Sequence, residues 1–168
     1  MVDLELGNQF ATWINTLGLS MGYMGIFIIS FIGAATIIFP IPSFIVVFTL
    51  GAVLNPWLVG ITAGVGNALG ELTGYALGKG GGKIIEKKYK KETEKYRKWF
   101  KKDRVFPLIV LFAATPLPDD VVGIVCGMFN YKLKKFIVAS LIGKIIMNLA
   151  LAWGGYYGIK FILTVFGG

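Results

Sequence analysis

Two Pro-x-Pro motifs interrupt apolar stretches of this chain, and they restrict its fold more than any other feature. The first, Pro40-Ile41-Pro42, separates residues 26–39 from residues 43–54. Each of these apolar arms is shorter than the roughly 20 residues that a helix needs to cross about 30 Å of hydrocarbon. Two such arms around a proline turn predict a re-entrant helical hairpin with its turn at residues 40–42. Its irregular backbone must be buried in protein or face water, because lipid cannot satisfy free N–H and C=O groups.

The second motif, Pro116-Leu117-Pro118, is followed directly by Asp119 and Asp120. It lies between two almost entirely apolar segments, residues 105–115 and residues 121–129. Carboxylates inside apolar sequence are expensive and indicate a functional site.

Basic residues decide between a hairpin and a crossing for this second motif. If residues 105–131 crossed the membrane, the lysines at 132–135 would lie opposite the strongly basic segment at residues 79–104. If the chain enters and returns, both basic clusters lie on the cytoplasmic side, as the positive-inside rule favours. The charge pattern therefore predicts a second re-entrant hairpin, with its turn at residues 116–120.

The two motifs belong to a predicted internal repeat with an offset of about 76 residues. Each hairpin is followed by an apolar segment of spanning length, residues 57–78 in the first repeat and residues 136–155 in the second. The first segment runs toward the basic linker and the second runs away from it, so the repeats are inverted. The offset, with one residue of slippage in places, pairs Pro40 with Pro116, Gly51 with Gly127, Gly66 with Gly143, Glu71 with Asn148 and Gly78 with Gly154.

Composition assigns the chain to membrane proteins, because 55% of its residues are hydrophobic, its mean hydropathy is +0.71 and only 15% are charged. Its 168 residues suit a single membrane domain. One cysteine excludes an internal disulfide, and the absence of histidine removes the commonest general base and metal ligand. We therefore expect no enzyme activity, no catalytic residue, no bound metal and no cofactor.

The expected fold is all-α and integral to the membrane. It contains two inverted repeats, residues 26–78 and 105–155, each a re-entrant helical hairpin followed by a transmembrane helix. Residues 1–25 form an N-terminal helix whose apolar spacing favours an interfacial position over the alternative, a first transmembrane span. Residues 79–104 form a basic amphipathic linker on the anionic cytoplasmic surface, and residues 156–168 form a short C-terminal segment.

Polar side chains inside the two predicted spans form the candidate site. Glu71 lies in the apolar part of the first span, where we expect a second acid or an ion-pair partner. Lys144 and Asn148 lie near the middle of the second span, where Lys144 neutralises a carboxylate or contacts a lipid phosphate. Asn67 and Asn148 either hydrogen-bond between helices or line a polar path, and the first interpretation is preferred.

The adjacent carboxyls of Asp119 and Asp120 repel each other, so one of them is expected to exchange a proton near neutral pH. The structural alternative is that one of them caps the outgoing hairpin helix, where the helix dipole favours an anion. The hairpin tips are architectural and expose backbone groups to a substrate. The tip residues are Pro40, Pro42, Ser43, Pro116 and Pro118.

Three segments of the chain resemble one known family. They are Phe39-Pro40-Ile41-Pro42-Ser43, the run GNALGELTGYALGK from Gly66 to Lys79, and Pro116-Leu117-Pro118-Asp119-Asp120 followed by Gly127. Over residues 29–158 the chain resembles the DedA superfamily, also described as the VTT domain or SNARE-associated Golgi protein family. The resemblance implies two inverted hairpin-plus-helix repeats and a role in moving lipids between leaflets.

The expected function is a membrane lipid transporter or flippase of DedA type, which moves an anionic lipid, polyprenyl phosphate or phospholipid, between leaflets with proton coupling. The alternatives are an energy-independent phospholipid scramblase and a membrane-protein assembly scaffold without transport. The expected partners are membrane lipids and, at the basic linker, anionic lipid headgroups, with no nucleic acid; the sequence is compatible with a homo-oligomer. We expect a multi-pass protein of the plasma membrane with residues 79–104 in the cytoplasm.

Overall fold

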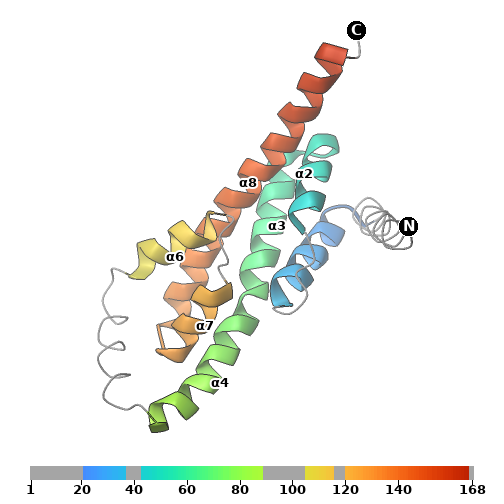
Figure 1. Ribbon diagram of the computed structural model, residues 1–168. Coiled ribbons are helices and arrows are strands. Elements are labelled where there is room, and N and C mark those ends of the chain that lie inside the picture. Colours follow the sequence, from blue (N-terminus) through green and yellow to red (C-terminus); the bar gives the residue numbers. More distant parts are fainter. Residues whose placement is uncertain (1–20, 37–42, 89–104, 116–119, 167–168) are drawn as a thin grey trace, which may run out of the picture.

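The computed structural model of the chain describes residues 21–36, 43–88, 105–115 and 120–166 (Figure 1). Every regular element in these ranges is a helix, so the prediction of an all-α chain is confirmed for the described residues. The turns of both predicted hairpins, most of the basic linker and most of the N-terminal segment lie outside these ranges.

The helices flanking the two predicted hairpin turns are short. The first is Met21–Ala35, the blue segment in Figure 1. Three others have 11, 9 and 9 residues, about half of the length that a membrane crossing requires. The labelled helices are α2 (Ser43–Val53), α3 (Pro56–Gly70), α4 (Leu72–Lys88), α6 (Val105–Ala113), α7 (Asp120–Met128) and α8 (Leu133–Phe166).

Local sequence signals account for two of the helix ends. The side chain of Asn55 caps α3 by accepting hydrogen bonds from two backbone N–H groups of the first turn, at 3.0 and 3.4 Å, and a proline occupies the first helical position. The chain leaves α7 through Asn130, which has a φ of 53°. The N–H groups of Asn130 and Tyr131 donate to the carbonyls of Gly127 and Cys126, which is the pattern of a Schellman motif.

A break at Glu71 divides the helix expected over residues 57–78 into α3 and α4, so the prediction of one uninterrupted span is wrong at this point. Glu71 has a ψ of −16°, away from the usual helical value near −42°, and its N–H is shared between two carbonyls. Gly70, which precedes it, weakens the helix locally. α4 continues roughly in the direction of α3 and extends beyond Gly78 into the predicted linker, as far as Lys88 (Figure 1).

α8 has 34 residues, and its segment Leu133–Gly158 is the one helix in the described ranges that is long and apolar enough to cross a membrane. The helix begins before the predicted span at residues 136–155 and runs on to Phe166, so the C-terminal segment expected at residues 156–168 is not a separate element over its described part. No proline interrupts this stretch. The glycine pair Gly154-Gly155 serves packing against α2 instead of ending the helix.

Close helix packing depends on glycine. α8 packs against α3, α2 and α6, and α7 packs on α4. α3 and α8 run antiparallel, because Gly60 faces Leu149 while Gly64 faces Ile145; a Cβ added to either glycine would lie 2.7 Å from the partner's Cα. A Cβ on Gly78 of α4 would overlap a carbonyl oxygen of α7. Small residues allow this approach of backbones, as is usual between helices in membranes.

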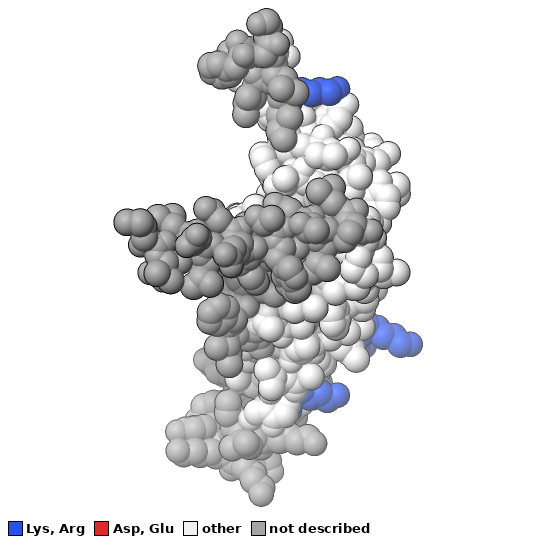
Figure 2. Space-filling view, turned by 90° about the vertical axis from the view of Figure 1, so that its right-hand side faces the viewer, with Lys and Arg blue, Asp and Glu red and all other residues white. Residues whose placement is uncertain are grey.

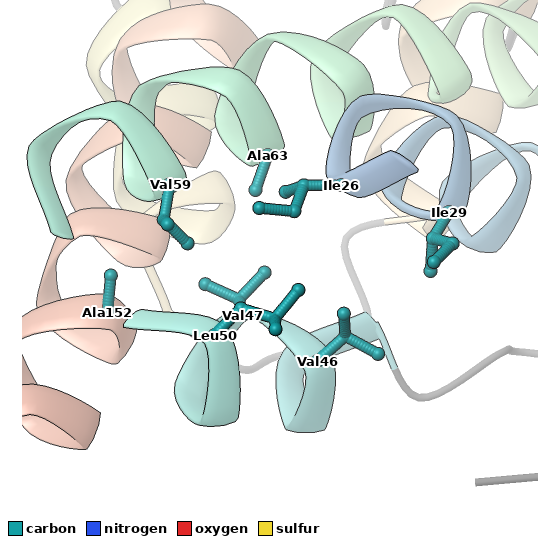
Figure 3. Close-up of a cluster of buried hydrophobic side chains, with 8 residues drawn as sticks. All are labelled: Ile26, Ile29, Val46, Val47, Leu50, Val59, Ala63 and Ala152. Atoms are coloured by element: carbon teal, nitrogen blue, oxygen red, sulfur yellow. The ribbon is translucent and has the colours of Figure 1, made fainter. Parts of the chain in front are cut away.

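Two clusters of buried apolar side chains hold the helices together. The first apolar cluster joins the Met21–Ala35 helix, α2, α3 and α8 (Figure 3), and consists of Ile26, Ile29, Val46, Val47, Leu50, Val59, Ala63 and Ala152. The second apolar cluster joins α4, α6, α7 and α8, and consists of Tyr75, Val105, Ile109, Cys126, Tyr131, Phe136 and Ala139.

The described outer surface is largely uncharged. On the face in Figure 2, lysine or arginine side chains are visible only near the upper end and in the lower part, and no Asp or Glu is visible among the described residues. Large apolar side chains are instead exposed, among them Phe44, Leu111, Ile146 and Phe161. An apolar exposed surface of this extent suits contact with lipid.

Candidate functional site

A buried ion pair joins the α3–α4 junction to the middle of the Leu133–Gly158 segment of α8. The ammonium of Lys144 lies 2.9 Å from a carboxylate oxygen of Glu71. The two residues are only 6% and 4% exposed, so solvent screens their interaction very little. Removing a charge from water costs several kcal/mol, and each of these charges needs the other to remain buried.

An amide pair lies one helical turn away between the same two helices. The side-chain N–H of Asn67 donates to the side-chain oxygen of Asn148 at 3.3 Å, and Asn148 itself donates to the backbone carbonyl of Lys144 at 2.7 Å. Glu71, the C-cap of α3, follows Asn67 by four residues, and Asn148 follows Lys144 by four residues on α8. Each pair of side chains therefore lies on one side of its segment. Together the four side chains form a buried polar centre.

The polar centre lies between the two apolar clusters. Along α3 and α4, Ala63 of the first cluster precedes the polar residues and Tyr75 of the second follows them. Along α8 the order is reversed, from Phe136 of the second cluster to Ala152 of the first. The low dielectric of such surroundings strengthens the ion pair, and it makes any unpaired charge there costly.

Two hydroxyls next to Glu71 connect it with both predicted hairpins. Thr73 donates to the carbonyl of Ala35, at the end of the Met21–Ala35 helix, at 3.1 Å. Tyr75 donates to the carbonyl of Tyr131, which follows α7, at 2.5 Å. The first turn of α4 therefore contacts one element of each predicted repeat. Neither hydroxyl was predicted from the sequence as part of the site.

A narrow recess adjoins the ion pair on the side of α6 and α7. It is too narrow to hold a water molecule. Ser140 was not predicted from the sequence, although its spacing of four and eight residues from Lys144 and Asn148 is a helical signal. The recess is lined by Glu71, Ile109, Ala113, Val122, Phe136 and Ser140.

The remaining predicted site residues are mostly outside the described structure. Ser43 is the first residue of α2 and is half-buried. Asp120 is the first residue of α7, while its side chain is outside the described structure. Within the described ranges, no three His, Cys, Asp or Glu side chains gather as metal ligands. Pro40, Pro42, Pro116, Pro118 and Asp119 lie outside the described residues.

Comparison with known proteins agrees with the motifs. The VTT domain family matches residues 41–157, which is more than half of the chain and includes the whole polar centre. The chain is similar to an uncharacterized protein of Methanocaldococcus jannaschii, with 27% identity over 154 residues that cover 88% of this chain and 91% of that protein. No solved structure matches it. The chain belongs to the VTT domain family, a family of membrane proteins of DedA type.

Proposed function

We propose that this protein moves an anionic lipid between the two leaflets of a membrane, with the Glu71–Lys144 pair in the path of the headgroup. The observation that carries the proposal is the burial of a full ion pair near the middle of a helix that is long enough to span a membrane. Ionisable residues at such depth are expensive, and they usually belong to substrate or proton pathways.

Charge balance suggests how the pair would work. Glu71 neutralises Lys144 while no substrate is bound. An anionic headgroup takes the place of the carboxylate at Lys144 when Glu71 accepts a proton, and the net charge of the site stays unchanged. One proton then accompanies each singly charged headgroup, which avoids the cost of an unbalanced charge in a low dielectric. Asp119 and Asp120 are further proton-coupling groups in this proposal.

Matching contacts support an inverted repeat, which would make the site accessible from either side. Gly51 of α2 lies against Ala152 of α8, and Gly127 of α7 lies against Tyr75 of α4. The offset of the predicted repeat relates Gly51 to Gly127. With one residue of slippage it also relates their partners, Tyr75 and Ala152.

A second pair of contacts obeys the same offset. Gly155 of α8 packs on the carbonyl of Phe48, and Gly78 of α4 packs on the carbonyl of Ile124. The offset relates Phe48 to Ile124 directly. It relates Gly78 to Gly155 with one residue of slippage, whereas the sequence alone paired Gly78 with Gly154. In the proposed topology the basic linker lies in the cytoplasm and binds anionic headgroups, and the protein is located in the plasma membrane.

The proposal is tested by reconstituting the protein in vesicles and following fluorescent phosphatidylglycerol between leaflets by dithionite quenching. Glu71→Gln and Lys144→Gln are each expected to slow movement at least about tenfold, because either change removes the charge exchange at the site. Lys134→Gln is the matched control, since Lys134 is exposed at the start of α8. Unchanged rates in both site variants would contradict the mechanism.

The same vesicles separate the alternative functions. Equal movement in both directions without a proton gradient would indicate an energy-independent scramblase. If no lipid moves and the purified protein instead carries other membrane proteins with it, the assembly scaffold becomes the better interpretation. Release of inorganic phosphate from the lipid would contradict our proposal that the protein is not an enzyme.

A further inference from the structure

The hydroxyl of Ser140 is fully buried, and the described residues offer it no hydrogen-bond partner. Helical hydroxyls usually donate to the carbonyl four residues earlier, as Thr36, Thr115 and Thr164 do in this protein at 2.7 to 3.1 Å. Ser140 does not make this bond. A buried polar group without a partner costs stability. Ser30 is buried in the same way, but only Ser140 lies at the recess beside the ion pair.

Ser140 lies at the wall of the recess, one helical turn before Lys144 on the same face of α8. Lys144 does not itself line the recess; it adjoins the recess through its ion pair with Glu71, which does. The rest of the lining is apolar except for Glu71, with Ile109 and Val122 on the hairpin helices and Phe136 on α8. The recess thus combines the Ser140 hydroxyl and the Glu71 end of the ion pair with apolar walls. Once Glu71 is protonated, a hydroxyl and a cation next to apolar walls suit an amphiphile that carries an anionic oxygen group.

We propose that this recess binds the phosphate of a lipid headgroup, with Ser140 donating a hydrogen bond to a phosphate oxygen and Lys144 supplying the positive charge. The inference rests on the proposed function and adds a substrate contact to it. Hydrogen bonds from a hydroxyl to a charged oxygen are about twice as strong as those between neutral groups, so the buried hydroxyl gains most from an anionic partner. The apolar walls favour a lipid over free phosphate.

The recess is the closed form of this site. It is too narrow for water, so water cannot satisfy Ser140 in this conformation. α6 and α7 form one side of the recess, while α8 and Glu71 form the other. In this proposal a headgroup enters when α6 and α7 shift away from α8.

Binding is tested on the purified full chain in detergent by calorimetric titration. The probes are dioctanoyl phosphatidic acid, dioctanoylglycerol, which lacks the phosphate, and inorganic phosphate. Ser140→Ala is expected to weaken the binding of phosphatidic acid about tenfold, the loss of one hydrogen bond to a charged group, and to leave dioctanoylglycerol unaffected. Ser30→Ala is the matched control, because Ser30 is equally buried without a partner among the described residues but packs on Gly66, away from the recess.

Several outcomes would overturn the inference. Unchanged binding of phosphatidic acid by Ser140→Ala would show that Ser140 does not contact the phosphate. An equal loss of affinity in Ser30→Ala would show that the effect comes from general changes in packing. If inorganic phosphate binds as tightly as phosphatidic acid, with the same dependence on Ser140, the ligand of the recess is free phosphate and not a lipid. If Ser140→Ala does not fold, Ser140→Cys retains the size of the side chain with a much weaker donor and takes its place.

The result also distinguishes this inference from the proposed function. If the wild-type protein moves lipid and Ser140→Ala binds and moves it equally well, the site is wrong and the transport proposal stands. If the wild-type protein moves no lipid but binds phosphatidic acid in a way that depends on Ser140, the transport proposal fails and the site stands.

Discussion

The ion pair Glu71–Lys144 and the amide pair Asn67–Asn148 join the same two helices one turn apart, and all four residues are buried. The amide pair joins the helices through a hydrogen bond between two uncharged side chains. The ion pair carries two charges into the same surroundings. The offset of the predicted repeat, with its one residue of slippage, relates Asn67 to Lys144 and Glu71 to Asn148, so under the proposed repeat each pair is the image of the other.

If the ion pair served only to hold the helices together, a second amide pair would be sufficient. Interhelical hydrogen bonds of side chains in a membrane protein average about 0.6 kcal/mol, and an amide pair supplies that at no charge cost. A buried ion pair contributes little net stability once its desolvation is counted. Removal of one partner nevertheless destabilises the fold strongly, because the other charge stays buried. The proposed function gives a reason for charge at a position where an amide pair would be sufficient for packing.

The largest effect is expected from neutralising one charge. Lys144→Gln leaves the Glu71 carboxylate buried without its cation, and we expect the free energy of unfolding to fall by about 3–5 kcal/mol. The measurement is an SDS titration in mixed detergent–lipid micelles. Lys134→Gln, at an exposed position, should change stability by less than about 0.5 kcal/mol. Equal stability of Lys144→Gln and the wild-type protein would mean that the Glu71 carboxylate does not depend on Lys144 for its stability in the fold.

Neutralising both charges should separate stability from function. The double variant Glu71→Gln/Lys144→Gln replaces the ion pair with an amide pair like its neighbour, and we expect its stability to return to within about 1 kcal/mol of the wild-type protein. Lipid movement in vesicles should remain as slow as in the single variants, because no charge is left to exchange. Full movement in the double variant would make the ion pair a structural feature.

The smallest effect is expected at the amide pair. Asn148→Leu removes one interhelical hydrogen bond, and we expect a loss of about 0.6 kcal/mol, and not more than about 1.7 kcal/mol, in the same SDS titration. Lipid movement should stay close to the wild-type rate. A loss as large as that of Lys144→Gln would show instead that the two pairs act as one unit, coupled through the hydrogen bond from Asn148 to the Lys144 carbonyl.

Much of the local architecture was predictable, because each helix carries its own signals. Asn55 with the proline after it starts α3, and apolar runs of limited length predict the short helices on either side of the two turns. The break at Glu71 was not predicted, since a single glycine before a glutamate does not require a helix to end. The continuation of α8 to Phe166 was also missed, because a glycine pair indicates a helix end unless its packing partner is known.

The candidate site was predicted only in part. The position of Glu71 and Lys144 in apolar sequence identified both as unusual residues, and this follows from the cost of charge in lipid alone. Their partnership did not follow, since Lys144 could have faced any of several carboxylates. Ser140 was missed because serine is common in membrane helices and becomes informative only when its hydroxyl is found without a partner among the described residues.

The sequence by itself determined the helical class, the membrane character and the residues whose charge needs a reason, because these depend on hydrophobicity, proline geometry and the cost of burial. Only the tertiary structure decided which charges meet. The antiparallel packing of α3 on α8, made close by glycines, brings Glu71 to Lys144 and Asn67 to Asn148. That choice rests on contacts between residues from distant parts of the sequence, which no local pattern of the chain specifies.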